Sequence, residues 1–150
     1  MENVDSIWND LFERYYKSWN GIEAAYDKIA ASYGVTSNVM NVLTLLCKNR
    51  EPMTQNELSQ ELYLSRQTVT SVVDSLERRG LVTRSISEKD RRSRVVCLTD
   101  EGLVFGRKLG RAMRKVEMDA FGMFSAEELR AFVYGMEKLS LGLAHVLESR

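Results

Sequence analysis

The chain has 150 residues, the usual size of one domain, and this leaves no room for two independent cores. Hydrophobic residues make up 44% and charged residues 28%, a balance that excludes disordered and fibrous classes. The amino terminus lacks a signal-peptide pattern, no apolar stretch is long enough to span a bilayer, and two cysteines cannot form a disulfide framework. We therefore expect a soluble, cytoplasmic protein without membrane contact, and one proline among 150 residues favours a mostly helical chain.

The net charge is zero, but the charges are unevenly distributed. Residues 61–115 contain 13 Lys/Arg and 7 Asp/Glu, a net charge of +6, whereas residues 1–60 and 116–150 each carry −3. A basic middle between acidic ends indicates that the middle meets a polyanion. A plain solvated charged face is the alternative reading of the charge alone.

The two ends of the chain are predicted to be long amphipathic helices. In residues 5–32, apolar residues recur three and four apart, from Trp8 to Ile29, which gives a wide apolar face. The last helix follows a capping-box pattern at Ser125 and carries more apolar surface than a free tail would need. A long aromatic-rich helix at a chain end often packs on a second chain.

The middle of the chain predicts three short helices. Gly34 ends the first helix, and Thr36 or Ser37 can cap the next one, which carries Val39, Val42, Leu43 and Leu46. Thr54 and Glu57 form a capping-box pattern at the start of a helix over residues 54–61. Ser65 is placed to cap a further helix that ends at Gly80, and its apolar positions are Val69, Val72, Val73 and Leu76.

A change of period follows the helix that ends at Gly80. Residues 81–86 and 94–98 are rich in β-branched side chains and predict two strands, joined by the polar loop 87–93. Thr99 opens a long helix in which Gly102, Gly106 and Gly110 lie on one stripe. Because each glycine costs about 1 kcal/mol against alanine in a helix, we expect another helix backbone to approach this stripe closely.

The predicted elements from residue 54 to residue 98 together make a helix-turn-helix followed by a β-wing. They are two helices joined by a turn, then two strands joined by a basic hairpin loop. In such units the second helix enters the major groove, and its first turns reach base edges. The residues predicted to do so are Arg66, Gln67, Thr68, Thr70 and Ser71. The cations predicted to reach a phosphate ridge or the minor groove from the hairpin tip are Lys89, Arg91, Arg92 and Arg94.

Two sequence segments resemble the MarR family of bacterial transcription regulators. Residues 90–102 read DRRSRVVCLTDEG, which is similar to the D-x-R wing signature followed by a strand and L-T-x-x-G. Upstream, residues 76–82 read LERRGLV, which is similar to the L-x-x-x-G-L-V junction between recognition helix and strand. The combination is fairly specific, and the helix order resembles the family over the whole length.

The resemblance implies a fold that is mainly α with a small β-wing, a six-helix homodimer with interlocked first and last helices. Residues 1–35 and 115–150 would form the dimerisation domain, and residues 36–114 the winged helix-turn-helix domain. Ser65 to Ser71 would read the major groove, Arg92 and Arg94 would act at the wing, and Asp90 would orient a wing arginine rather than touch DNA.

The resemblance also implies a small amphipathic or phenolic ligand, bound between the dimer helices and the DNA-binding lobe, that releases DNA. Its candidate pocket residues are Tyr15, Trp19, Tyr26, Met40, Leu43 and Met113, each of which could instead serve the core or the dimer interface. Peroxide-sensing relatives use a first-helix cysteine, but here the cysteines are Cys47 and Cys97, which are expected to be packing residues. With His145 as the single histidine, no metal site or cofactor is expected.

The function predicted from these features is that of a sequence-specific regulator, most often a repressor in this family. It would recognise a pseudo-palindromic double-stranded DNA operator as a homodimer. The alternative is a winged-helix module that binds an acidic protein partner through the hairpin. An enzyme is not expected, because no nucleophile–base pair, phosphate-binding glycine loop or metal cluster is visible in the sequence.

Overall fold

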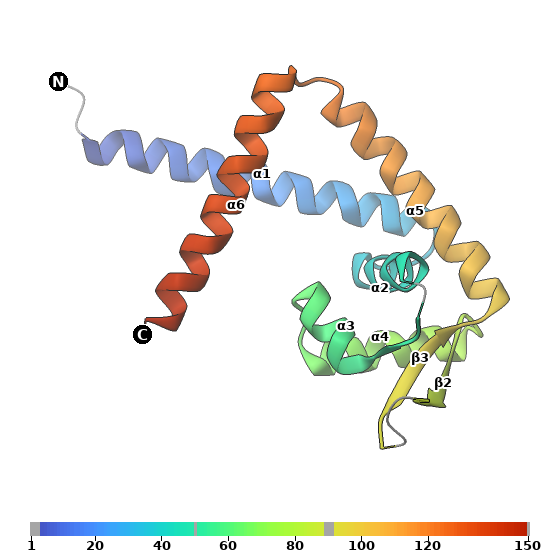
Figure 1. Ribbon diagram of the computed structural model, residues 1–150. Coiled ribbons are helices and arrows are strands. Elements are labelled where there is room, and N and C mark those ends of the chain that lie inside the picture. Colours follow the sequence, from blue (N-terminus) through green and yellow to red (C-terminus); the bar gives the residue numbers. More distant parts are fainter. Residues whose placement is uncertain (1–3, 50, 89–91, 150) are drawn as a thin grey trace. The chain divides into compact units, whose positions relative to one another are not determined.

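The computed structural model describes residues 4–49, 51–88 and 92–149 (Figure 1). The chain divides into two compact units, residues 1–113 and 114–150, and the boundary lies inside one helix. In chain order the described elements are α1 (Val4–Ser32), α2 (Ser37–Lys48), β1 (Met53–Thr54), α3 (Gln55–Leu62), α4 (Arg66–Arg78), β2 (Val82–Ile86), β3 (Arg94–Leu98), α5 (Asp100–Phe121) and α6 (Ala126–Glu148).

The helix starts and ends in the first unit follow the predicted capping residues. After α1 the chain turns at Gly34, whose φ of +68° lies in the left-handed region that glycine adopts without strain. Thr36 then accepts a hydrogen bond from the backbone N–H of Val39, at 3.3 Å, and caps α2. Each such cap contributes about 1 kcal/mol, which is enough to fix where a helix begins.

The caps of α3 and α4 set the start of the helix-turn-helix. At α3 the Thr54 hydroxyl accepts from the Glu57 N–H at 3.2 Å, while the Glu57 carboxylate accepts from the Thr54 N–H at 2.7 Å. At α4 the Ser65 hydroxyl accepts from the backbone N–H of Thr68 at 3.1 Å. The predicted capping box and N-cap are therefore both present.

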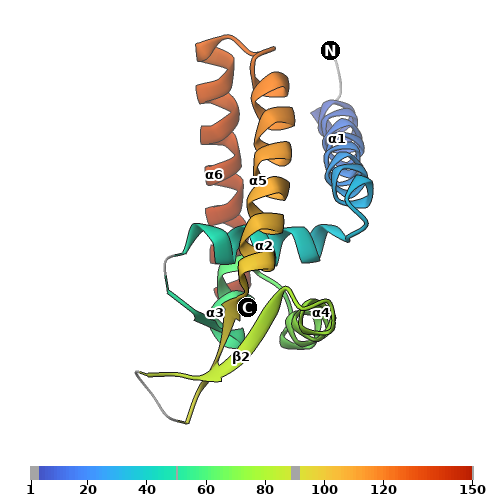
Figure 2. The same cartoon turned by 90° about the vertical axis from the view of Figure 1, so that its right-hand side faces the viewer.

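The wing is part of a three-stranded antiparallel sheet in the order β1-β3-β2. β2 and β3 pair from Val82 opposite Leu98 to Ile86 opposite Arg94, as predicted for a hairpin. Sequence reasoning missed β1, whose two residues pair with the other edge of β3 at Val95 and Val96. The hairpin extends beyond the helices of the winged helix (Figure 2).

The core lies within the first unit, where α2, α3 and α4 pack against the sheet. The side chains predicted to hold α2 and α4 in place are all buried, including Leu43 and Leu76 at 0% exposure. Partly buried residues from α1 and α5 cover this core, such as Tyr26, Ile29 and Met113. The buried set is Ala30, Val39, Met40, Val42, Leu43, Leu46, Met53, Leu58, Val69, Val72, Val73, Leu76, Leu81, Val82, Val96 and Leu109.

The second unit contains the end of α5 and all of α6, which begins with the predicted capping box at Ser125. The rings of Phe121, Phe124 and Phe132 cluster with centroids 5.8 to 6.5 Å apart. No side chain of α6 is buried among the described residues. The apolar side chains that it leaves exposed include Phe132, Val133, Met136, Leu139, Leu143, Val146 and Leu147.

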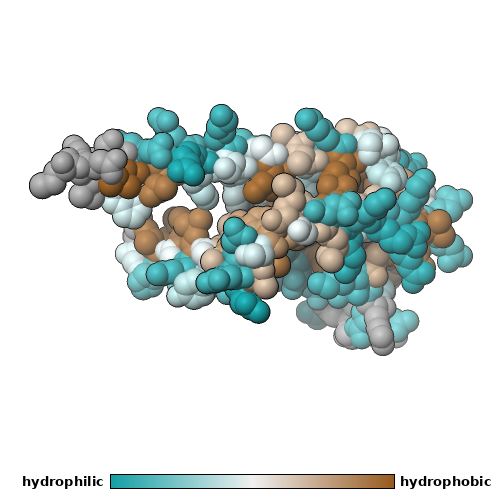
Figure 3. Space-filling view, turned by 90° about the horizontal axis from the view of Figure 1, so that it is seen from above, coloured by the Kyte–Doolittle hydropathy of each residue, from teal (hydrophilic) through white to brown (hydrophobic). Residues whose placement is uncertain are grey.

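Helix α1 likewise leaves much of its apolar face uncovered. The apolar side chains that are each more than 40% exposed on α1 include Ile7, Trp8, Leu11, Phe12 and Ile22. Apolar surface shows as brown among the hydrophilic residues in Figure 3.

In the described residues no single helix is long and apolar enough to cross a membrane; α1 and α2 meet the length and hydropathy requirement only as a pair, bent by 77°.

The glycine stripe of α5 makes close contacts within the first unit, as predicted, but only in part with a helix. A Cβ on Gly106 would lie 2.5 Å from Sγ of Cys47, on α2. A Cβ on Gly102 would lie 1.8 Å from the carbonyl oxygen of Leu81, which precedes β2 rather than belonging to a helix. Gly110 is different, because the nearest atom to its Cβ position is a methyl group of Thr44, at an ordinary 3.5 Å.

These three positions predict a graded response to alanine. Gly102→Ala must move the Leu81 carbonyl and should lower the free energy of unfolding by about 3 kcal/mol or more. Gly110→Ala should leave it unchanged or raise it by up to ~1 kcal/mol, through better helix propensity. Urea unfolding of both variants checks this, and equal values for the two would contradict the close contact at Gly102.

Candidate nucleic-acid interface

The outer face of α4 carries most of the predicted reading residues. Val69, Val72, Val73 and Leu76 hold the opposite face to the core, so the helix is fixed in rotation about its axis. The side chains turned outward at its amino-terminal end are Arg66, Gln67, Thr70 and Ser71, which are exposed, and Thr68, which is half-buried.

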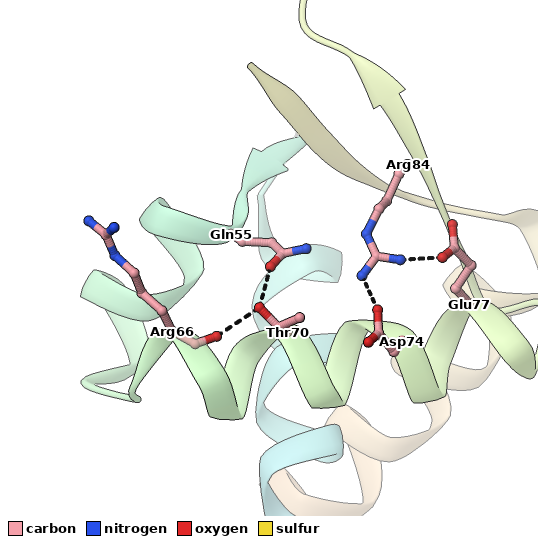
Figure 4. A network of polar contacts seen from close by, with 6 residues as sticks. All are labelled: Gln55, Arg66, Thr70, Asp74, Glu77 and Arg84. Atoms are coloured by element: carbon pink, nitrogen blue, oxygen red, sulfur yellow. Dashed lines mark hydrogen bonds and ion pairs between the residues drawn. The ribbon is translucent and has the colours of Figure 1, made fainter. Parts of the chain in front are cut away.

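The hydroxyl groups of Ser65, Thr68 and Thr70 already have intramolecular partners. The oxygens of Ser65 and Thr68 lie 2.8 Å apart, at the cap. The Thr70 hydroxyl lies 2.8 Å from Oε1 of Gln55 and 2.9 Å from the backbone oxygen of Arg66, so its single proton is shared between two acceptors (Figure 4). Thr70 therefore links α4 to α3, which leaves its oxygen lone pairs and its methyl group to meet a ligand.

Arg66 and Gln67 are the long polar side chains on the first turn of α4, and both are exposed. The Arg66 guanidinium points away from the polar network around Thr70 (Figure 4). Arginine forms bidentate hydrogen bonds with guanine, and glutamine with adenine, so these two side chains can discriminate bases.

An ion-pair network joins the wing to α4, and sequence reasoning missed it. Arg84, from β2, contacts the carboxylates of Asp74 and Glu77, both on α4 (Figure 4). The Arg84 side chain is 17% exposed, whereas the two carboxylates are 47% and 42% exposed. Arg84 therefore fixes α4 against the wing instead of adding free positive charge. The signal in the sequence was the pair of carboxylates three residues apart on one helix face.

The wing is described up to its tip on both strands. The backbone N–H of Ser87 donates to the oxygen of Ser93 at 2.9 Å, and Arg92 and Arg94 are exposed. Three predicted wing residues, Lys89, Asp90 and Arg91, lie outside the described residues.

Of the six predicted ligand-pocket residues, four lie in the core or against it and two lie elsewhere on α1. Met40 and Leu43 are fully buried in the core, and Tyr26 and Met113 pack against it. Tyr15 and Trp19 lie on α1 with ring centroids 6.3 Å apart. A hollow of about 1100 Å³ lies elsewhere, between α3 and the wing, and Thr54, Glu57, Glu61, Ser85, Ser87 and Cys97 are among its lining residues.

The cysteines are half-buried, with free thiols. Burial raises the pKa of the Cys47 thiol, which opposes formation of a reactive thiolate. Within the described residues, no three His, Cys, Asp or Glu side chains gather in a way that could hold a metal ion.

This architecture defines the winged helix-turn-helix class. Residues 33–93 match the MarR family model. The chain is 33% identical over 116 residues to the HTH-type transcriptional regulator PrsX of Escherichia coli, covering 77% of this chain and 68% of PrsX. The chain therefore belongs to the MarR family of transcriptional regulators, and the predicted winged helix-turn-helix fold, mainly α with a small β-wing, is confirmed.

Two solved structures show the same fold. The MepR–DNA complex of S. aureus superposes with a TM-score of 0.77 at 20% identity, covering 85% of this chain and 97% of MepR. CouR of Rhodococcus jostii RHA1, bound to p-coumaroyl-CoA, superposes with a TM-score of 0.73 at 21% identity, covering 93% of this chain and 95% of CouR.

The Arg84 network predicts a larger effect on stability for Arg84 than for Arg78, an exposed arginine at the end of α4. Arg84→Ala should lower the free energy of unfolding by about 1–2 kcal/mol, because two half-exposed carboxylates lose their partner and are left to repel each other. Arg78→Ala, which removes the same charge from an exposed position at the end of α4, is the matched control. Thermal unfolding measures the stability of the two variants. An equal loss of stability in both would contradict the role of Arg84 in fixing α4 against the wing.

Proposed function

We propose that this regulator binds a pseudo-palindromic operator as a homodimer and represses transcription, with α4 reading the major groove and the wing contacting the backbone beside it. The observation that carries the proposal is the outward placement of Arg66 and Gln67 on the first turn of a helix whose other face is locked in the core. The net charge of +6 over residues 61–115 supports a polyanionic partner.

In this proposal Ser65 and Thr68 fix the start of the recognition helix α4. Thr70 and Ser71 offer short side chains that let the helix approach the bases. Arg92 and Arg94 contact phosphates from the wing, and Lys89, Asp90 and Arg91 remain candidates at its tip. The DNA complex of MepR, which shares the fold, supports this mode of binding.

Dimerisation is supported by the apolar faces of α1 and α6. A monomer would expose Trp8, Leu11 and Phe12 on one helix and Leu139 and Leu143 on another, and large exposed apolar surfaces of this kind mark interaction sites. We assign residues 1–35 and 115–150 to the dimerisation domain and residues 36–114 to the DNA-binding domain. Two reading helices about 34–36 Å apart then match half-sites one helical turn apart.

We further propose release of DNA by a small amphipathic or phenolic ligand. CouR, of the same fold, binds p-coumaroyl-CoA. Tyr15, Trp19, Tyr26 and Met113 are the accessible members of the predicted pocket set, and Met40 and Leu43 would form its floor. The protein acts in the cytoplasm, where its operator lies, and carries out no catalysis.

The alternative, a module that binds a protein through its hairpin, has less support. A protein-binding α4 would present apolar side chains, whereas its exposed residues are Arg66, Gln67, Thr70 and Ser71. PrsX and PecS, two relatives that match the chain, are transcriptional regulators.

Operator binding is tested by anisotropy with a duplex spanning the intergenic region beside the protein's own gene, at two salt concentrations. Arg66→Ala should weaken binding to this duplex about tenfold or more while changing binding to an unrelated duplex much less, because it removes a base contact.

The wing is tested in the same assay. Arg92→Ala and Arg94→Ala should weaken binding to both duplexes, and each should reduce the slope of affinity against salt concentration by about 1. Wild-type protein that binds both duplexes equally would refute specific recognition.

The dimer is tested by light scattering at micromolar concentration. The wild type should have the mass of two chains, and Leu143→Glu, which buries a charge in the proposed interface, should shift it towards one chain. Glu137→Gln is the control for a charge change on the same helix. A wild-type monomer would contradict the proposed assembly.

A further inference from the structure

Tyr63, in the turn between α3 and α4, combines a left-handed backbone conformation with an exposed aromatic side chain. It ends α3 with φ 53° and ψ 33°, in the left-handed region. Within the described part of the chain it is the sole non-glycine residue with a positive φ. Its side chain is 96% exposed, the highest value among the exposed large hydrophobic side chains.

Neither the backbone nor the core accounts for a tyrosine here. The turn depends on the backbone N–H of Tyr63, which donates to the oxygen of Gln60 at 3.3 Å, and glycine or asparagine would adopt this conformation with less strain. The ring packs on almost nothing, so it adds little to the stability of the fold. An aromatic side chain in a strained and exposed position points to a role outside the folded chain.

The neighbours of Tyr63 determine the direction in which its side chain leaves the protein. Leu62 and Leu64 pack against the core on either side. Leu64 is held by two hydrogen bonds to Ser59, one from its N–H at 3.1 Å and one to its oxygen at 2.6 Å. Tyr63 therefore projects into solvent two residues before Ser65, the cap of α4, at the helix end that carries Arg66.

We propose that Tyr63 contacts the DNA backbone: its phenolic hydroxyl donates to a phosphate oxygen at the rim of the major groove, and its ring lies against the adjoining deoxyribose. This inference rests on the proposed function, in which the start of α4 enters the groove. A groove about 12 Å wide leaves roughly 6 Å from its centre to either rim, about the reach of a tyrosine side chain from its Cα.

A phosphate contact by a neutral side chain has a distinct signature. Tyrosine is among the side chains that bind phosphate oxygens and set the register of a protein on its duplex. Such a contact carries no base information, so its loss weakens binding to every sequence. Because the hydroxyl is uncharged and displaces no counterion, its loss leaves the salt slope unchanged, unlike the loss of an arginine.

The test compares Tyr63→Phe and Tyr63→Asn with the wild type, by anisotropy on the intergenic duplex and on an unrelated duplex at two salt concentrations. Tyr63→Phe should weaken binding about fivefold to both duplexes, and Tyr63→Asn, which also removes the ring, at least tenfold, both with the wild-type salt slope. Tyr16→Phe, which removes the same hydroxyl from an exposed position on α1, should bind like the wild type.

A stability measurement separates this role from a structural one. Tyr63→Asn should raise the thermal midpoint, since asparagine tolerates the left-handed backbone better, while it lowers DNA affinity. Affinity within twofold of the wild type for Tyr63→Asn would overturn the inference, as would a lowered midpoint that accounts for the lost binding. A wild type that binds neither duplex would refute the proposed function, and this inference with it.

Discussion

The hydrogen bonds around Leu81 determine how the recognition helix, the wing and α5 are held together. The Leu81 N–H donates to the oxygen of Leu76, in the last turns of α4, and its oxygen accepts from the N–H of Thr99 at 3.1 Å. The Thr99 hydroxyl donates to the oxygen of Gly80 and accepts from the N–H of Gly102. A chain of short polar contacts thus joins the end of α4, the base of both wing strands and the start of α5, and it leaves no space for a side chain at Gly102.

The proposed DNA-binding surface is likewise held in place by polar contacts within the chain. Hydroxyl side chains near the start of α4 serve mainly to build the unit, since Ser65 caps the helix and Thr70 links it to α3. Arg84 adds a further restraint from β2. Rigidity achieved in this way lets Arg66 and Gln67 present their polar ends without losing much conformational freedom on binding. The residues that hold α4 in place and the residues proposed to contact DNA are therefore different sets.

Sequence patterns predicted the helices and the hairpin well, because their signals are local. Capping residues such as Thr36, Thr54, Ser65 and Ser125 mark the starts of helices by hydrogen bonds within one turn. β1 escaped prediction because two residues have no period, and their strand character comes only from pairing with β3. A close contact at the glycine stripe of α5 was predicted, but the carbonyl of Leu81 as the partner of Gly102 was not. Local sequence patterns do not identify which distant segment packs against a residue.

The candidate site was predictable to a lesser degree. The outward face of α4 follows from its buried period, whereas the Arg84 network depends on how a strand crosses a helix. Met40 and Leu43, two of the predicted pocket residues, are fully buried in the core, and the pocket assignment stays a prediction for them. An apolar side chain on an amphipathic helix gives the same signal for core and for pocket, so periodicity alone cannot separate the two.

The capping box of α6 has a consequence for how this helix responds to acid. Hydrogen bonds from Ser125 hold the pKa of the Glu128 carboxyl below its ordinary value. A carboxyl whose pKa is lower when folded stabilises the folded state above its unfolded pKa and stops doing so as the pH falls through the folded one. The first turn of α6 thus keeps its ionised cap throughout the neutral range and loses it only when the pH falls below the ordinary pKa of a glutamate carboxyl. Modest acidification inside a cell leaves the start of this helix intact.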